Sequence, residues 1–267
     1  MLSFVIIILG LIVGSFLNVV IYRLPKAVIK QYKYPSQYHF LNLLSVISTP
    51  RSCAPCCKKQ LSWFENIPIL SWALLQGRCH YCKKPISVRY PLIEILTATF
   101  FYICFNKYGF TPATFLWAIF LSYLITLFFI DLDTFLLPDV LTISLSILGL
   151  TASFFEWVST PIESALLGLA LGYGLPWIVN KIYYAWRKQD GFGAGDFKLL
   201  AALGIWLGWK YVIPILFASA VLAIVYALFL NLLGQKINLK TQLPYGPFLI
   251  TISVLLFFSN FFTEIGN

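Results

Sequence analysis

Four cysteines in the first third of the chain are spaced as metal ligands. Cys53 and Cys56 form one Cys-x-x-Cys pair and Cys79 and Cys82 a second, with 22 residues between the pairs. Each pair can place two thiolates on one ion, and two pairs complete the tetrahedral set of a zinc site. Because four thiolates leave no open coordination position, we expect a structural zinc ion that holds its loop together. The alternative is a pair of disulfides.

Acidic residues at the ends of apolar runs form a second candidate site. A carboxylate is costly inside a membrane, so its presence there indicates function. Asp131 and Asp133 close one apolar run and Asp196 opens another. Asp131 and Asp133 lie about 200° apart around a helix, so they cannot face the same partner, and Asp131 is the deeper of the two. If Asp131 and Asp196 meet, they can share a proton and activate a water for attack on a peptide carbonyl.

A glycine-rich segment precedes Asp196. Gly193 and Gly195 have no Cβ, so a substrate strand could approach the acid closely across them. The segment superficially matches a dinucleotide-binding fingerprint, but no strand precedes it and no βαβ unit is present. The pattern therefore favours a peptide site over a phosphate site.

The elements that must position these residues are membrane helices. The 267 residues are 60% hydrophobic and 11% charged, with a mean hydropathy of +0.83. Soluble domains carry about 25% charged residues, so the composition excludes a cytosolic or secreted enzyme, a disordered chain and a coiled coil. We expect an all-α polytopic membrane protein with about eight transmembrane helices and a cytoplasmic zinc-ribbon-like loop after the first. The apolar runs lie near 2–22, 91–106, 113–130, 140–158, 162–184, 197–209, 211–233 and 244–262.

The basic residues predict the orientation of these helices. Residues 1–22 form the first span, residues 23–90 a polar loop that holds eleven of the nineteen basic residues, and residues 91–267 the remaining helices. Alternating the spans places seventeen basic residues on one side and two on the other, which predicts an outside N-terminus and a cytoplasmic loop. In that reducing compartment thiols persist, and the basic groups near the cysteines face anionic lipid. Because the basic loop is tethered to apolar membrane helices, we expect it not to bind nucleic acid.

Five segments in order carry a resemblance to a known family. They are residues 14–20 with 23–25, the cysteine tetrad with residues 66–68 and 71–72, residues 86–91 with Glu94, residues 130–139, and residues 193–198. Together they resemble the bacterial type IV prepilin peptidases, the leader peptidase/N-methyltransferases of pilus and type II secretion systems. The resemblance runs nearly end to end and implies an intramembrane aspartic protease of the GxGD type. Two residues depart from the family pattern, Ala54 and Cys57; Cys57 can compete for the metal, although we expect the zinc site to survive.

The resemblance also implies the activity and its residues. It implies that Asp131 and Asp196 are the catalytic pair, at the cytoplasmic face of the bacterial inner membrane. The expected substrates are prepilins and pseudopilins, whose short basic leader is cut after a glycine. The new N-terminal residue is then methylated with S-adenosylmethionine. Because the leader is basic, three further acids are candidate leader contacts: Asp133, Asp139 and Asp190. The alternative is that these acids cap helices or pair with neighbouring basic residues.

Two residues are candidates for the methyltransferase site by position alone. Gly77 directly precedes the second cysteine pair, and Glu94 lies near the start of the apolar run at 91–106. The plainer interpretation is that Gly77 is a turn residue. For Glu94, it is that the acid is stabilised by the dipole at a helix N-terminus.

A different class of function uses the same acids. In an ion or proton transporter, Asp131 and Asp196 would form a relay, as intramembrane acids often do. The chain has no internal repeat of the kind that transporters carry, and transport gives no reason for a zinc loop. A third interpretation is a structural assembly protein whose acids only cap helices.

Overall fold

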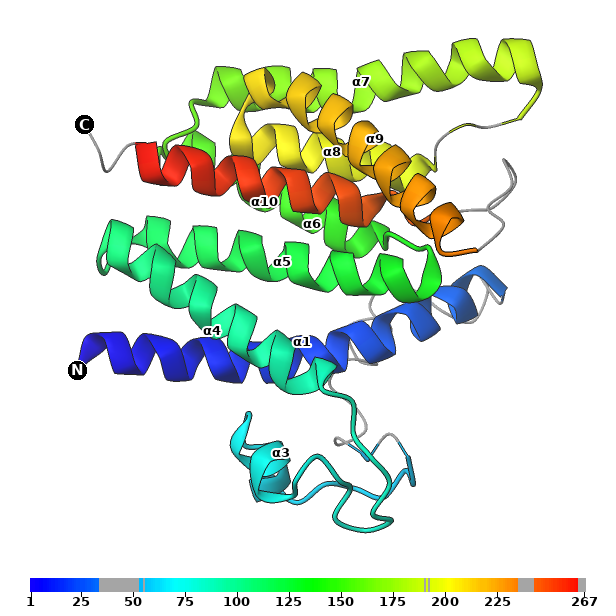
Figure 1. The fold of residues 1–267 in the computed structure, drawn as a ribbon. Helices are drawn as coiled ribbons and strands as arrows, with labels where there is room; N and C mark the ends of the chain where they lie inside the picture. Colours follow the sequence, from blue (N-terminus) through cyan, green and yellow to red (C-terminus); the bar gives the residue numbers. More distant parts are fainter. Residues whose placement is uncertain (34–52, 55, 190, 192, 235–242, 264–267) are drawn as a thin grey trace. The chain divides into compact units, whose positions relative to one another are not determined.

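Each apolar run predicted from the sequence overlaps a helix in the computed structural model (Figure 1). The structure describes residues 1–33, 53–54, 56–189, 191, 193–234 and 243–263. The helices that match the runs are α1 (Leu2–Lys33), α4 (Arg89–Tyr108), α5 (Pro112–Thr134), α6 (Asp139–Phe154), α7 (Ile162–Arg187), α8 (Ala194–Leu207), α9 (Trp209–Leu232) and α10 (Gly246–Thr263). Within the described ranges all the regular structure is helical, which confirms the all-α prediction.

The helices differ in whether they are long and apolar enough to cross a membrane. Among the described residues, four helices are long and apolar enough to cross a membrane, namely α1, α5, α7 and α9. The helices α6 and α10 are apolar but shorter, and α8 has only 14 residues. Eight full spans are therefore not confirmed, because several predicted runs form helices too short or too polar to cross alone.

The first helix is longer than its apolar run. It continues for three turns past Tyr22, through Pro25 to Lys33. Leu24, Ala27 and Val28 remain buried in this extension, so the apolar face of the helix continues beyond the first charges. Packing therefore extends the helix into the polar segment. The apolar run in the sequence does not contain this information.

The chain forms two compact units, Met1–Thr126 and Leu127–Asn267, and the border between them falls inside α5. In the first unit, α1 and α4 lie side by side (Figure 1). A Cβ on Gly10 would lie 2.6 Å from the Cα of Ala98, and one on Gly14 would lie 2.6 Å from the Cα of Glu94. These glycines let the two helix backbones approach closely, as their four-residue spacing predicts.

In the second unit, α8 is the central helix, in contact with α6, α7, α9 and α10. Nine residues of α8 between Phe197 and Trp206 are buried, all of that stretch except Lys198. On the α7 side, a Cβ on Gly168 would overlap the backbone of Gly204, and one on Gly172 would lie 2.6 Å from the Leu200 carbonyl oxygen. A helix enclosed on all sides in this way carries the Asp196 end of the candidate site on a fixed support.

The described part of the polar segment between α1 and α4, residues 53–54 and 56–88, is held by turns and short helices. It contains the 3₁₀ turn η1 (Trp63–Asn66) and the five-residue helix α3 (Leu70–Leu74). Two isolated antiparallel bridges, Cys53 with Gln60 and Arg78 with Pro85, close two short turns that carry the cysteines. Little apolar area is available to such a segment, which is the situation in which a metal commonly stabilises a fold.

Candidate functional site

Asp131 lies near the C-terminal end of α5 and is buried, with 4% of its surface exposed. Its Oδ2 accepts a hydrogen bond of 3.0 Å from the backbone N–H of Gly246, the first residue of α10. The first N–H groups of a helix have no partner within the helix, so they are suited to an anionic oxygen. The start of α10 therefore orients the Asp131 carboxyl group.

Asp196 lies in the first turn of α8, where Gly193 is the N-cap residue. Its carboxyl group interacts with the Gly193 backbone and lies within electrostatic range of the Asp131 carboxyl. Asp196 is therefore at N3, the position at which the acid of a capping box accepts a hydrogen bond from the N-cap backbone. Two acids from different helices are brought to one site within the second unit, as the sequence predicted.

The two glycines before Asp196 have different surroundings. Gly193 is exposed, and among the described residues a Cβ there would meet only the Asp196 Oδ2, at 3.1 Å. A Cβ on Gly195 would instead lie 2.9 Å from the Cβ of Leu137. Leu137 also lies against Gly246, so this one side chain packs beside both acids. Leu137 therefore fills the space at Gly195, whereas no described side chain other than Asp196 does so at Gly193.

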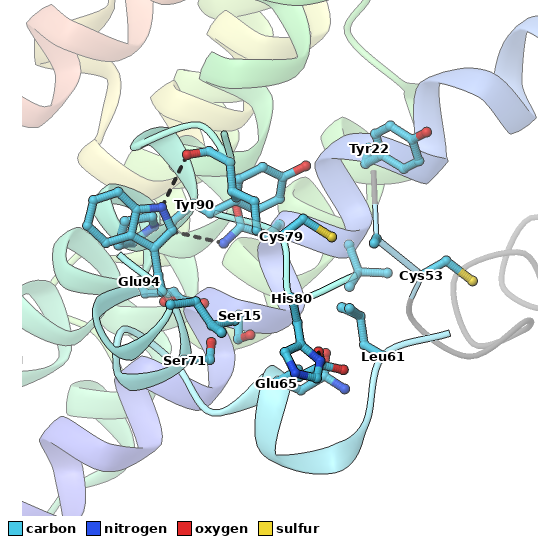
Figure 2. A pocket seen from close by; sticks show the side chains of 18 of the residues that line it. Ser15, Tyr22, Cys53, Leu61, Glu65, Ser71, Cys79, His80, Tyr90 and Glu94 are labelled. Carbon is cyan, nitrogen blue, oxygen red and sulfur yellow. Dashed lines mark hydrogen bonds and ion pairs between the residues drawn. The ribbon is translucent and has the colours of Figure 1, made fainter. Parts of the chain in front are cut away.

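A cavity in the first unit is lined by α1, the polar segment and α4 (Figure 2). On its α4 wall, Glu94 accepts a hydrogen bond of 2.8 Å from the Ile69 backbone and one from the Ser15 side chain. Glu94 is in the second turn of α4, beyond the residues that the helix dipole stabilises, so the dipole interpretation is wrong. Instead, Glu94 connects α1, the polar segment and α4.

A second buried acid, Glu65, also lines the cavity. Its Oε2 accepts hydrogen bonds from the Ser62 N–H, at 2.6 Å, and from the Tyr81 hydroxyl, at 3.2 Å. Its Oε1 lies 3.3 Å from His80 Nδ1, and Figure 2 shows the imidazole directed at this carboxylate. Glu65 therefore ties η1 to the second cysteine turn, a role that the sequence analysis missed.

Gly77 acts at the cavity through Trp72. Its φ of +68° lies in the left-handed region, and a Cβ there would lie 2.9 Å from the indole ring of Trp72. Trp72 lines the cavity and donates a hydrogen bond of 3.2 Å to the Ile86 carbonyl. Gly77 is thus a turn residue, and the absence of a Cβ leaves the space that the Trp72 indole occupies.

Four thiols form a cluster in the polar segment. The sulfur atoms of Cys56, Cys57, Cys79 and Cys82 all lie within 4.8 Å of one another. Tetrahedral zinc with Zn–S bonds of about 2.3 Å separates its sulfurs by about 3.8 Å, so this cluster fits a Cys₄ metal site. The predicted set contained Cys53, and in the cluster Cys57 takes its place. Spacing in the sequence could not reveal this difference because it depends on how the first turn folds.

The Cys79 thiol has an environment that favours the thiolate. Backbone hydrogen bonds from Cys82, and also from Tyr81, lower its pKa to about 7, against the opposing effect of burial. Metal binding requires deprotonated thiols, so a lowered pKa reduces the cost of placing a metal here.

Two family models match the chain. Residues 8–108 match the Bacterial Peptidase A24 N-terminal domain, and residues 118–228 match the Type IV leader peptidase family. A Neisseria gonorrhoeae protein named prepilin leader peptidase/N-methyltransferase is 37% identical over 261 residues, 95% of this chain and 89% of that protein. The chain belongs to the type IV leader peptidase family.

Further relatives carry the same name. One from Xanthomonas campestris pv. campestris is 38% identical over 258 residues, 94% of this chain and 88% of the relative. One from Legionella pneumophila is 38% identical over 258 residues, 93% of this chain and 88% of the relative. No solved structure matches the chain. Membership in the leader peptidase family disfavours the transport alternative.

Tyr245 lies near the acid pair of this leader peptidase and was not among the residues predicted from the sequence. Its hydroxyl lies 2.7 Å from the Ser219 hydroxyl of α9. Tyr245 directly precedes Gly246, whose backbone N–H donates a hydrogen bond to Asp131. The phenol also lies within electrostatic range of Asp196, and its hydroxyl group can donate a hydrogen bond. The Pro-Tyr-Gly-Pro sequence at 244–247 was the available signal, since it punctuates the last apolar run.

The three acids predicted as leader contacts differ in their surroundings. Asp133 is exposed on the last turn of α5. Asp139 forms a 2.7 Å ion pair with Lys198 of α8, so a basic residue of the protein itself balances its negative charge. Asp190 lies outside the residues that the structure describes.

Proposed function

We propose that this protein removes the leader of prepilins and pseudopilins by hydrolysis at Asp131 and Asp196. The observation that carries the proposal is that these two carboxyl groups, one from the end of α5 and one from the start of α8, lie within electrostatic range of each other. The names of relatives that align with nearly the whole chain supply the substrate class. An acid pair in a partly enclosed site is a suitable arrangement for activating water against a peptide bond.

In the proposed mechanism, the two aspartates share one proton. The deprotonated carboxyl takes a proton from water, which attacks the scissile carbonyl carbon. The protonated carboxyl donates first to the carbonyl oxygen and, as the C–N bond breaks, a proton passes to the leaving amine. Too low a pH protonates the base and too high a pH removes the acid. Cleavage should therefore follow a bell-shaped pH profile whose two pKa values belong to the pair.

The proposed location is the bacterial inner membrane, with the N-terminus outside and both the acid pair and the cysteine loop on the cytoplasmic side. The distribution of basic residues supports this orientation, because the polar loop holds eleven of the nineteen. The four long apolar helices support membrane insertion. We also propose that the basic loop contacts anionic lipids, which attract clustered lysines and arginines.

We propose that S-adenosylmethionine, the methyl donor, binds in the cavity of the first unit. Glu65 and Glu94 supply carboxylates that would attract its sulfonium cation, and Trp72 and Tyr90 supply aromatic faces for its adenine. The cavity has a volume of about 190 Å³. Sites that enclose a drug-sized ligand have about 300–1,000 Å³, so we expect part of the donor to lie outside it.

We propose a structural role for the metal, which we expect to be zinc. The thiol cluster supports a site closed by four sulfurs, with no position left for water or substrate. The metal would then hold the two cysteine turns together and so shape the cavity wall that carries His80 and Cys79.

Among the candidate leader contacts, Asp133 has the exposure that an encounter with a basic peptide requires. We propose that it attracts the leader by its charge. The Asp133→Lys variant should raise KM for a peptide with a basic leader several-fold while changing kcat little. A peptide with a neutral leader is the control, and an equal rise in KM for both peptides would contradict the proposal.

The experiment that tests the peptidase is cleavage of a prepilin-type peptide by the detergent-purified protein. The Asp131→Asn and Asp196→Asn variants should each abolish cleavage after the glycine. The matched control is Glu163→Gln, which changes an exposed acid in the first turn of α7. If either aspartate variant is well folded and cleaves at the parental rate, the acid-pair mechanism is wrong.

A further inference from the structure

The two cysteine turns of the polar segment have the same backbone hydrogen-bond pattern, offset by 25 residues. In the first turn, the Ala54 N–H donates to the Lys59 carbonyl at 2.8 Å and the Lys58 N–H to the Ala54 carbonyl at 2.9 Å. In the second turn, the Cys79 N–H donates to the Lys84 carbonyl at 2.9 Å and the Lys83 N–H to the Cys79 carbonyl at 3.0 Å. The residue after each turn has nearly the same positive φ, 57° at Lys58 and 59° at Lys83.

The bridges that close the turns keep the same offset. Cys53 pairs with Gln60 in the first turn, and Arg78 pairs with Pro85 in the second. Cys53 therefore occupies the position of Arg78, just outside the turn. In the same register, Ala54 occupies the position of Cys79 and Cys57 the position of Cys82.

This register differs by one residue from the register of the Cys-x-x-Cys letters. Matching Cys53 and Cys56 to Cys79 and Cys82 aligns the two sequence motifs, but it does not align the hydrogen bonds of the two folded turns. In the folded register, the first turn lacks its first ligand because Ala54, which is 2% exposed, has no sulfur. The first turn would supply one thiolate, from Cys57, and the site would have three.

Cys56 supplies a fourth sulfur within the same cluster. Its Sγ lies 3.0 Å from that of Cys82, and the Cys57 Sγ lies 3.9 Å from that of Cys79. Cys53 is outside this cluster and lines the cavity instead (Figure 2). Tetrahedral zinc requires four donors, and thiolates are the donors it most commonly has in structural sites.

We propose that the metal ligands are Cys56, Cys57, Cys79 and Cys82, and that Cys53 is not a ligand. Adjacent Cys56 replaces the thiolate that Ala54 cannot provide. The first turn thus binds through two neighbouring residues, and the second through a Cys-x-x-Cys pair. This assignment concerns the metal site alone and does not depend on the peptidase function.

The first test compares Cys53→Ser with Cys57→Ser in the full-length protein. Zinc per chain is measured by atomic absorption, and Co²⁺ substitution reports the number of thiolates through its charge-transfer absorption. Cys53→Ser should retain one metal per chain and the parental Co²⁺ spectrum. Cys57→Ser should lose at least tenfold in Co²⁺ affinity. The opposite result, with metal lost in Cys53→Ser and kept in Cys57→Ser, would overturn the assignment.

The second test moves the ligand to the position that the folded turn assigns to it. Cys56→Ser alone should weaken Co²⁺ binding, and the double variant Ala54→Cys/Cys56→Ser should restore it, because it places a thiol where the second turn has Cys79. Full binding by the single variant, or no recovery in the double variant, contradicts the proposal. Thermal unfolding of each variant, recorded in the same detergent, separates loss of a ligand from loss of the fold.

Discussion

At the scale of single residues, the contact between Asp131 and the start of α10 makes a sharp prediction. Gly246→Ala would place a Cβ 2.7 Å from the Asp131 Oδ2, while the helical backbone there accepts alanine. The carboxyl group must move, and displacement of a catalytic group by about 1 Å can cost about 100-fold in rate. We expect kcat for peptide cleavage to fall 10- to 100-fold, with KM nearly unchanged.

The control for this variant is its thermal unfolding, which should stay close to that of the parent. Unchanged turnover by Gly246→Ala would mean that the orientation of Asp131 by α10 does not matter for cleavage. A large fall in melting temperature would point to packing against Leu137, which also lies against Gly246.

Tyr245 is expected to be a positioning residue that acts through its hydroxyl group. Tyr245→Phe removes the 2.7 Å contact with Ser219 but keeps the ring in place. The loss of a hydrogen bond of about 0.5–1.5 kcal/mol should lower kcat about 2- to 10-fold. Because the phenol is close to Asp196, the pH profile of cleavage should shift as well. Ser219→Ala, which removes the partner and keeps the phenol, tests whether the contact or the hydroxyl itself is required.

At the scale of helices, the close packing of α7 on α8 supports the Asp196 end of the site. Gly168→Ala would force a Cβ into the backbone of Gly204, and overpacking of this kind costs about 1–3 kcal/mol. Gly174 is on the same helix, and no described atom lies within 4 Å of an added Cβ, so Gly174→Ala should be neutral or stabilise by about 0.5–1 kcal/mol. Unfolding of both variants in one detergent measures the difference, and equal stabilities would contradict this account of α7 and α8.

The helices illustrate what a sequence can and cannot predict. Each apolar run overlaps a helix because the membrane requires every backbone group to bond within its segment. The length of α1 was not predictable, since burial of Leu24 and Val28 depends on neighbours far along the chain. Eight full spans are not confirmed for a related reason: α8 is enclosed by other helices, and an apolar sequence does not distinguish protein surroundings from lipid.

The site shows the same division between chemistry and folding. Asp131 and Asp196 could be selected from their residue type, their depth and the glycines beside Asp196. Tyr245 and Glu65 were missed because their importance comes from partners distant in sequence, such as Ser219 and His80. The metal ligands could not be predicted from the sequence because the two Cys-x-x-Cys spacings are identical. The difference arises in the fold, where the first turn is shifted by one residue relative to its motif.

At the scale of the whole molecule, the cysteine cluster and the acid pair belong to different compact units. Because folded units open locally and separately, damage to one should affect its own activity most. Removing the metal with a strong chelator should therefore reduce methylation at least tenfold and leave cleavage within about twofold of the untreated protein. Parallel assays of the two reactions on one peptide, with readdition of zinc, measure this. A parallel loss of cleavage would show that the metal also supports the acid pair.

The border between the units lies within a continuous helix, and this bears on how the protein could be divided genetically. A gene split at the contact border would cut α5 between Thr126 and Leu127, leaving only four residues before Asp131 and placing the acid near the end of a short helical fragment. The turn at Gly109, between α4 and α5, offers a break that keeps both helices whole, and it lies in the gap between the two matched domains. Two fragments separated there and expressed together should complement each other and restore cleavage, whereas a pair divided at residue 126 should not.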